Sequence, residues 1–316
     1  MSALIECVPN VSEGQNAEHI AQMAEVIRQT PAVKLLHIDS GFAANRTVFT
    51  FAGTPLAVFE AAFKLYKKAA TLIDMQQHKG EHPRMAAVDV CPFIPVSGIS
   101  IDELLPLHKD FTTHLANELN ISGYWYEHSA SAPERKNLAF LRKGEYEQLP
   151  EKQKTLPFDF GPTDYRKTFG ATVTGIRNFL VAYNINLATA DADKAKSIAS
   201  KLRESSGGLK GVKSIGWYIH DFKCAQVSCN LVDLSQNGIL ETFLKTKTLA
   251  EELGVKVTGS ELIGLAPLAE FKKVQHYLQL PENDLNWNAI IDFLGLTEVD
   301  DFSPQERVLE LKLQAV

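Results

Sequence analysis

The same order of predicted elements occurs twice along this chain, and this repetition limits the folds that the chain can adopt. Alternating apolar residues with β-branched side chains predict strands, and apolar residues spaced about 3.6 apart predict helices. Each copy has the order strand, helix, strand, strand, helix, strand. The first copy occupies residues 4–9, 17–29, 33–39, 46–52, 56–77 and 87–94. The second copy occupies residues 179–187, 190–204, 212–219, 225–233, 239–253 and 255–259.

This βαββαβ order is that of a ferredoxin-like unit, in which the helices pack on one face of an antiparallel sheet. We therefore predict an α+β fold made of two duplicated ferredoxin-like (βαββαβ) subdomains, residues 1–178 and 179–316, with helices on one face of each sheet. Periodicity predicts further helices outside the two copies. They are expected at 101–119, at 132–143, at 287–294 and after Pro304.

The overall composition argues against several classes of function. The net charge of the 316 residues is −6, so we expect no nucleic-acid partner. The cysteines, at positions 7, 91, 224 and 229, form no CxxC pair, which argues against a zinc knuckle or a disulfide framework. The start of the chain lacks the features of a signal peptide, and no stretch approaches about 20 apolar residues. We therefore expect a cytoplasmic protein without a membrane partner.

The segment HKGEHPRM at 78–85 concentrates ionisable side chains where the backbone cannot stay helical. Gly80 is a natural stop after a helix, and Pro83 disfavours the helical conformation for the residue before it. His82 is therefore predicted to lie in an extended loop between a helix and a strand, a position that suits proton transfer. The alternative for His82 is an imidazole bonded to backbone. For His78 we expect a cation at the helix C-terminus.

The spacing of His78 and His82 also matches a metal pair, but only on a continuous helix. Gly80 and Pro83 interrupt that helix, and Glu81 is the only other ligand type nearby. Because protein metal sites usually need about three or more such ligands, we predict no metal.

Polar residues also gather at the ends of the first predicted strands. Asp39 closes the second strand, and Asn45 and Arg46 open the third, so these three share one end of a hairpin. Asp39 could instead cap the turn, and Asn10, after the first strand, could lead into a helix. Arg46 and the cations of residues 78–85 have no acidic cluster opposite them, which favours a small polycarboxylate ligand.

Two glycine-containing stretches, GATVTG at 170–175 and TGSELIG at 258–264, superficially resemble phosphate loops. A P-loop requires Lys and then Ser or Thr after its second glycine, whereas Ile176 and Arg177 follow the first stretch. We therefore expect tight glycine turns in which backbone amides approach a ligand.

The motifs of this chain, taken together, resemble those of the glutamate formimidoyltransferases, which include the formiminotransferase half of formiminotransferase-cyclodeaminase. The matching motifs are ECVPNVSEG at 6–14, NRTV at 45–48, LIDM at 72–75, HKGEHPRM at 78–85, DVCPFIPV at 89–96, GEYEQLP at 144–150, GATVTG at 170–175, YNIN at 183–186, GWY at 216–218, AQVS at 225–228 and FSPQER at 302–307. The resemblance implies two ferredoxin-like subdomains, in agreement with the repeated order of elements, and a homodimer.

The resemblance also implies an activity, the folate-dependent transfer of a formimino group from N-formimino-L-glutamate to N5 of tetrahydrofolate in histidine degradation. Tetrahydrofolate would be the co-substrate. His82 falls on the catalytic base of the family, and Asp39 is expected to orient His82 or to stabilise the amidinium group. The residues expected to bind substrate are Asn10, Asn45, Arg46, Lys79 and Arg84. The folate-contacting segment falls on Gly161, Pro162, Thr163, Asp164, Tyr165, Arg166, Lys167, Thr168, Phe169 and Gly170.

The chain departs from the family pattern in that segment, where DYRKT at 164–168 replaces a less charged stretch. We also expect no cyclodeaminase activity, because the chain stops where that domain would begin. Other interpretations stay open. The same site could use a formyl donor such as N-formylglutamate, turn over 5-formyltetrahydrofolate, or bind folate or an amino acid without turnover, and a metallohydrolase is the outsider.

Overall fold

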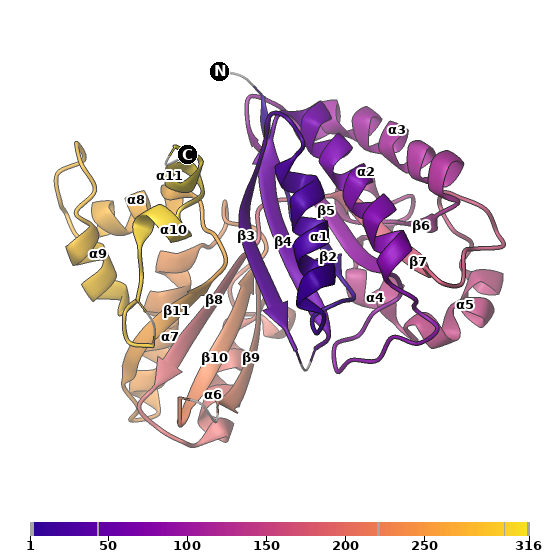
Figure 1. Cartoon of the computed structure of the whole chain (residues 1–316). Coiled ribbons are helices and arrows are strands. Elements are labelled where there is room, and N and C mark those ends of the chain that lie inside the picture. The colour runs from indigo at the N-terminus through magenta and orange to yellow at the C-terminus, as the bar shows by residue number, and fades with distance from the viewer. Residues whose placement is uncertain (1–2, 43, 220–221, 300, 315–316) are drawn as a thin grey trace. The chain divides into compact units, whose positions relative to one another are not determined.

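The computed structural model describes residues 3–42, 44–219, 222–299 and 301–314. The chain divides between Arg177 and Asn178 into two compact units, here called the N-terminal unit and the C-terminal unit (Figure 1). Each unit combines a sheet with several helices, which confirms the expected α+β class. Within the described ranges, no helix has both the length and the apolar character that crossing a membrane requires.

The sheet of the N-terminal unit has seven strands in the order β3-β4-β1/β2-β5-β7-β6, where β1 and β2 both lie between β4 and β5. The pairs from β3 to β5 are antiparallel, whereas β7 runs parallel to both β5 and β6. The antiparallel part is compatible with the expected ferredoxin-like unit, and β7 and β6 extend it at one edge. The strands are β1 (Leu4–Cys7), β2 (Asn10–Val11), β3 (Val33–Gly41), β4 (Arg46–Gly53), β5 (Val88–Ser97), β6 (Ser122–Trp125) and β7 (Ala171–Ile176).

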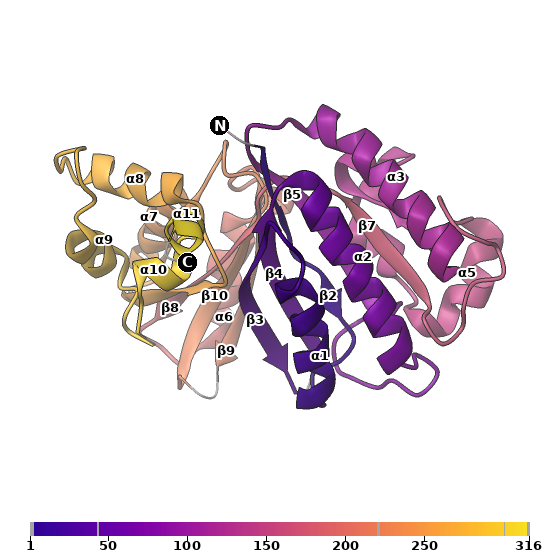
Figure 2. The same ribbon diagram turned by 45° about the horizontal axis from the view of Figure 1, so that its top comes forward.

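Three long helices, α1 (Ala17–Arg28), α2 (Pro55–Leu72) and α3 (Ile101–Leu119), lie side by side across one face of this sheet (Figure 2). α2 starts with a proline, whose missing N–H costs nothing at a first helical position. Its buried side chains recur every three or four residues, so one face of the helix joins the strands in the main hydrophobic core.

A smaller hydrophobic cluster covers the opposite face of the sheet near β7. Thr172 and Thr174 face the long helices, where they contact Tyr66 of α2 and His108 of α3. The alternate residues of β7 point the other way. They join a separate cluster that comprises Ala171, Val173, Met85, Val90, Tyr124, Tyr126, Leu141, Leu149 and Tyr165. The segment after α3 supplies this cover with α4 (Leu138–Arg142), α5 (Leu149–Thr155) and the 3-10 turns η1 (Glu127–Ser129), η2 (Pro133–Lys136) and η3 (Tyr146–Gln148).

The C-terminal unit has an antiparallel four-stranded sheet in the order β11-β8-β10-β9. Helices α6 and α7 contact this sheet and each other, and α8 and α9 pack outside α7. The elements are β8 (Val181–Leu187), α6 (Ala192–Leu202), η4 (Glu204–Ser206), β9 (Val212–Ile219), β10 (Cys224–Leu231), α7 (Ile239–Glu252), β11 (Val257–Ile263), α8 (Leu268–Tyr277), α9 (Trp287–Leu294), α10 (Pro304–Arg307) and α11 (Leu309–Gln314).

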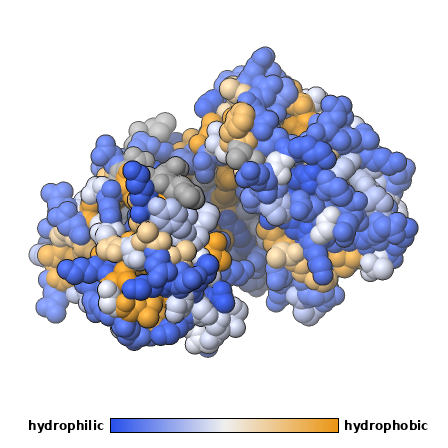
Figure 3. All heavy atoms as spheres, turned by 90° about the horizontal axis from the view of Figure 1, so that it is seen from below, coloured by the Kyte–Doolittle hydropathy of each residue, from blue (hydrophilic) through white to orange (hydrophobic). Residues whose placement is uncertain are grey.

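The surface is mainly hydrophilic on the face drawn in Figure 3, with hydrophobic side chains in small groups. The large hydrophobic residues that stay exposed include Phe42 and Leu56 in the N-terminal unit and Ile215 and Trp217 in the C-terminal unit.

Helix α2 is shorter than predicted. It ends at Leu72 rather than near residue 77, because Asp74 accepts hydrogen bonds from the Gln76 backbone and the Gln77 side chain and so turns the chain. The N–H of Met75 then donates to Thr168 O at 2.9 Å. Residues 73–87 consequently form a loop between α2 and β5, here called the histidine loop because it carries His78 and His82.

The two glycine-containing stretches are strands, so the predicted turns are wrong. GATVTG contributes β7, which pairs with β5 and β6 and is buried on both faces, by the long helices on one side and the smaller hydrophobic cluster on the other. Gly170 enters this strand with a φ of 85°, and a Cβ there would collide with the carbonyl oxygen of Met85. The stretch at 258–264 likewise contributes most of β11. In both, the strand preference of the central residues outweighs the flanking glycines.

Candidate active site

The histidine loop is fixed to the β3–β4 hairpin by Asn45. The Asn45 side chain donates to Lys79 O at 2.7 Å and accepts from the backbone N–H of Gly14 at 2.9 Å. His78 Nε2 donates to Asn45 O at 3.0 Å. Asn45 adopts a φ of 48°, which asparagine tolerates better than most residues. These bonds use both polar groups of the Asn45 side chain, so its observed role is to hold the loop.

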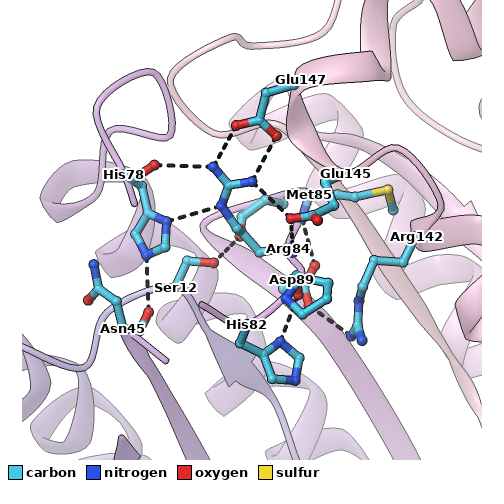
Figure 4. A network of polar contacts seen from close by, with 12 residues as sticks. Ser12, Asn45, His78, His82, Arg84, Met85, Asp89, Arg142, Glu145 and Glu147 are labelled. Atoms are coloured by element: carbon cyan, nitrogen blue, oxygen red, sulfur yellow. Dashed lines mark hydrogen bonds and ion pairs between the residues drawn. The ribbon is translucent and has the colours of Figure 1, made fainter. Parts of the chain in front are cut away.

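Arg84 ties the same loop to the turn around η3 (Figure 4). Its guanidinium donates to both carboxylate oxygens of Glu147, at 2.7 and 2.8 Å, and to Glu145 at 3.1 Å. It also donates to His78 O at 3.2 Å, and Nε donates to His78 Nδ1 at 3.4 Å. The hydrogen bond with Arg84 lowers the pKa of Glu147 to about 2, so that carboxylate stays ionised. Arg84 is buried with all its nitrogens engaged, so in this structure it positions the histidine loop, and its contact with substrate stays a prediction.

His78 is not a cation at a helix end, because α2 stops six residues earlier at Leu72. Its Nδ1 accepts from Arg84 while its Nε2 donates to Asn45, which is the pattern of a neutral imidazole. Burial lowers the pKa of His78, and the charge of Arg84 lowers it further. The expected macrodipole role is therefore wrong.

His82 lies in the histidine loop, as predicted, and its ring is half-buried. Nδ1 is 2.8 Å from Pro83 O and 3.2 Å from Arg46 Nη1. Because a carbonyl oxygen can only accept, the shorter contact assigns the proton to Nδ1 and makes Arg46 a nearby charge. Burial lowers the pKa of His82, and the Arg46 charge lowers it further. A neutral ring of this tautomer presents the lone pair of Nε2, as a general base requires.

Asp89 is fully buried and holds the groups around His82 in place. Oδ2 lies 2.8 Å from Arg46 Nη1 and 2.8 Å from Arg142 Nη2, and Oδ1 accepts from the N–H of Met85 at 2.8 Å. Asn10 adds a further contact, because its Oδ1 accepts from Arg46 Nε at 3.0 Å. Arg46 is therefore held by both Asp89 and Asn10, and its positive charge lies close to the ring of His82.

Asp39 and Lys79 are both exposed. In the β3–β4 pair Asp39 lies opposite Val48, and Val48 is two residues from Arg46 on the same strand. Because side chains alternate along a strand, Asp39 and Arg46 occupy the same face of the sheet. The residue that contacts His82 is Arg46, so the structure offers no support for the expectation that Asp39 orients the ring.

The expected folate segment is uneven in its accessibility. Phe169 is fully buried, and its ring stacks on that of Tyr66 with the centroids 5.9 Å apart. Gly170 is also buried at the entry to β7, and Tyr165 is 7% exposed. The exposed members are Gly161, Thr163, Asp164 and Lys167, and the partly buried members are Pro162, Arg166 and Thr168. The accessible part of the expected segment is therefore residues 161–168, apart from the buried Tyr165.

Sequence reasoning missed Asp89 and Arg142, although Asp89 left a signal. It is a single carboxylate within an otherwise apolar run at 86–96, and buried carboxylates are rare unless they are paired. Nothing in the sequence identifies Arg142 as its partner, because 53 positions separate the two and only the fold brings them together.

Metal ligands do not cluster in the described part of the chain, where no group of three or more His, Cys, Asp and Glu residues could hold an ion.

Comparison with known proteins connects these two units to one family. Residues 4–177 match the family model described as the formiminotransferase domain, N-terminal subdomain, and residues 182–314 match the formiminotransferase domain model. A formimidoyltransferase-cyclodeaminase of Rattus norvegicus is 44% identical over 98% of this chain and 60% of its own length. The glutamate formimidoyltransferase of Streptococcus pyogenes serotype M1 is 42% identical over 90% of this chain and 96% of its own length. The glutamate formimidoyltransferase of Thermoplasma acidophilum is 37% identical over 88% of this chain and 93% of its own length.

The chain thus spans about 60% of the length of the formimidoyltransferase-cyclodeaminase of Rattus norvegicus, and it matches the bacterial and archaeal relatives over nearly their full length. The histidine loop, Asp89 and the turn around η3 all lie inside the first matched region. Since the matches run through both compact units, the chain belongs to the formiminotransferase family.

Proposed function

We propose that this chain transfers the formimino group of N-formimino-L-glutamate to N5 of tetrahydrofolate, giving 5-formiminotetrahydrofolate and L-glutamate. The observation that carries the proposal is the state of His82, a half-buried imidazole with Nδ1 bonded to backbone and its pKa lowered by burial and by Arg46. The names of the bacterial and archaeal relatives support the same reaction.

His82 acts in this proposal as the proton shuttle. As N5 attacks the amidine carbon, His82 Nε2 accepts the proton that N5 loses. The imidazolium then returns that proton to the glutamate nitrogen as the C–N bond breaks. The bond from Nδ1 to Pro83 O fixes the ring in one tautomer throughout. The Arg46 charge destabilises the imidazolium and so favours return of the proton to the leaving group.

Asp39 has a different role in this proposal. Its exposed carboxylate shares a sheet face with Arg46, and an amidinium group is a cation, so we propose that Asp39 stabilises the positive charge of the formimino group. Arg46 and the exposed Lys79 are proposed to bind the substrate carboxylates. Asn10 holds the Arg46 guanidinium in place, and Asn45 holds the backbone at Lys79. For folate, the proposal keeps residues 161–168, which are accessible except for Tyr165.

The test is a spectrophotometric assay with tetrahydrofolate and N-formimino-L-glutamate. Acid converts 5-formiminotetrahydrofolate to a methenyl product with a distinct absorbance. Product formation by the wild type is the expected result. Turnover with N-formyl-L-glutamate alone would indicate a formyl donor, and tight tetrahydrofolate binding without product from either donor would indicate a binding protein.

The proposal extends to a cytoplasmic homodimer that needs no metal. Light scattering measures the number of chains in the assembly directly. Dialysis against a chelator tests the metal requirement, and the enzyme is expected to stay fully active.

A further inference from the structure

Arg46 and Arg142 share a single carboxylate, which leaves an excess positive charge beside the proposed base. Arg46 Nη1 and Arg142 Nη2 each lie 2.8 Å from the same atom, Oδ2 of Asp89. The other oxygen of Asp89 is taken by the N–H of Met85. Two guanidinium groups therefore meet one carboxylate in a buried setting, where an unbalanced charge attracts an anion strongly.

Arg142 also has a donor that the described protein leaves unsatisfied. Its Nε is buried and forms no hydrogen bond with any described residue, whereas its Nη2 is held in the ion pair with Asp89. Buried donors without an acceptor are costly, and a guanidinium has five N–H groups to satisfy. Arg135 Nη1 is likewise buried without a hydrogen bond to a described residue, but its ion pair is with Asp159, which pairs with no second arginine among the described residues. Arg142 instead shares the Asp89 carboxylate with Arg46.

The two arginines influence His82 in different ways. Arg46 Nη1 is 3.2 Å from His82 Nδ1, and the charge of Arg142 acts on the same ring. Figure 4 shows the Arg142 side chain directed at Asp89. The Arg142 side chain keeps 15% of its exposure, so part of it can be reached from solvent although Nε and Nη2 are buried.

We propose that Arg46 and Arg142 together bind the α-carboxylate of the glutamyl substrate. The inference rests on the proposed function and names the group that this subsite recognises. In N-formimino-L-glutamate the α-carbon carries both the α-carboxylate and the nitrogen that leaves. An α-carboxylate held beside His82 therefore brings the leaving nitrogen to the base. The side-chain carboxylate is farther from that nitrogen by the length of the side chain.

The test compares N-formimino-L-glutamate with 4-(formimidoylamino)butanoate, which lacks only the α-carboxylate. With the wild type, KM for this analogue should be about 10- to 100-fold higher, the range expected for losing charge-assisted hydrogen bonds. Arg142→Met should raise KM for N-formimino-L-glutamate by a similar factor, with little effect on KM for the analogue or for tetrahydrofolate. Arg135→Met is the matched control, because it removes an arginine of similar exposure, 12% against 15%, and should leave the KM ratio at its wild-type value.

An unchanged KM for N-formimino-L-glutamate in Arg142→Met would overturn the subsite and leave the proposed activity standing. N-formiminoglycine keeps the α-carboxylate and lacks the side-chain carboxylate. If Arg142→Met loses only the preference for N-formimino-L-glutamate over N-formiminoglycine, Arg142 recognises the side-chain carboxylate, and the proposed subsite is overturned. If Arg142→Met does not fold, Arg142→Lys keeps the charge without the planar fork and should raise KM by a smaller factor.

Calorimetric binding of L-glutamate separates this inference from the proposed function. Binding by the wild type that Arg142→Met abolishes supports the subsite even in a protein that transfers nothing. If the wild type and Arg142→Met bind L-glutamate equally and the wild type does transfer the formimino group, the subsite is rejected and the proposed function stands.

Discussion

Arg46 Nη1 lies 3.2 Å from Nδ1 of His82. A guanidinium at this distance from an imidazole disfavours its protonation, and it adds to the effect of burial. The surroundings of His82 thus select the neutral ring, which is the form that can accept a proton. The charges that act on the ring are those of Arg46, Arg142 and Asp89, and the two arginines outnumber the carboxylate.

Replacement of Arg46 should move the acidic limb of the pH profile. A base works when it is unprotonated, so a lowered His82 pKa puts the acidic limb of kcat/KM below pH 6.5, the ordinary value. Arg46→Gln removes a positive charge and should shift that limb to higher pH, whatever it does to the absolute rate. The measurement is kcat/KM from pH 4.5 to 9, with an NMR titration of the His82 ring in the substrate-free protein. A limb that stays in place, or moves to lower pH, would contradict the assigned electrostatics.

His82→Ala should lower kcat by about 10²–10⁴-fold, the usual contribution of general acid–base catalysis. The ring is half-buried and bonds only locally to Pro83 O, so the fold should survive. Circular dichroism and the methenyl assay check the two parts of this prediction. His78→Ala serves as a comparison, because it removes the other imidazole of the same loop. Full turnover by a folded His82→Ala protein would end the assignment.

Asp39→Asn should reduce kcat more than it changes KM. The carboxylate is exposed and is proposed to act on the positive charge of the formimino group, which matters most as the tetrahedral intermediate forms and collapses. Steady-state kinetics with both substrates varied give the two constants. A large rise in KM with kcat unchanged would identify Asp39 as a substrate contact instead.

Asp89→Asn should destabilise the N-terminal unit by about 3–5 kcal/mol, because it leaves the buried Arg46 and the partly buried Arg142 without their carboxylate. The double variant Asp89→Asn with Arg142→Met should recover part of that loss, since only Arg46 then lacks its carboxylate. Urea unfolding of the wild type, both single variants and the double variant forms a complete cycle. Additive effects would show that Arg142 and Asp89 are not coupled.

His108 should make the stability of the N-terminal unit depend on pH. The ring is fully buried in α3 and bonds to Thr174 Oγ1 at 3.1 Å, and burial lowers its pKa to about 3. Since the folded state resists protonation, the His108 contribution is fully present above the unfolded pKa near 6.5. It is lost progressively as the pH falls from there towards about 3.

The variant His108→Gln keeps a donor for Thr174 and cannot titrate. Between pH 7 and 4.5 the wild type should lose about 2–3 kcal/mol more than this variant, from about 1.4 kcal/mol per pH unit. Urea unfolding at the two pH values measures the difference. His114→Gln, at an exposed position of the same helix, is the matched control and should behave as the wild type. Equal losses in His108→Gln and the wild type would contradict the prediction.

Local sequence patterns predicted the elements whose limits depend on nearby residues. The helix at 101–119 was predicted to the residue, because Ser100 and Glu103 form a capping box at its start and apolar spacing carries it to Leu119. The strand at 212–219 and the helix at 287–294 were also predicted with their observed limits.

Two of the failures involve contact between residues far apart in sequence. The early end of α2 is accompanied by a hydrogen bond between Met75 and Thr168. The buried strand β7 is stabilised by β5 and β6, and its own residues give no alternation because both faces are covered. α8, at Leu268–Tyr277, was missed as well.

The candidate site divides in the same way. His82 could be predicted because Gly80 and Pro83 set the local backbone around it. Its partners could not all be predicted, since Arg46, Asp89 and Arg142 come from β4, β5 and α4 and meet only in the folded unit. Arg84 was predicted to bind substrate from its charge alone, and its engagement by Glu145 and Glu147 could not be read from spacing.

The position of β7 between β5 and β6 governs how the N-terminal unit can be assembled during synthesis. β6 leaves the ribosome well before β7, yet β7 is the strand that pairs with it. Until residue 176 has emerged, β5 and β6 both present unpaired edges that strands of other chains can join. A nascent or truncated chain that ends before β7 is therefore prone to aggregate, and the N-terminal unit completes its fold only after nearly all of its length has been made.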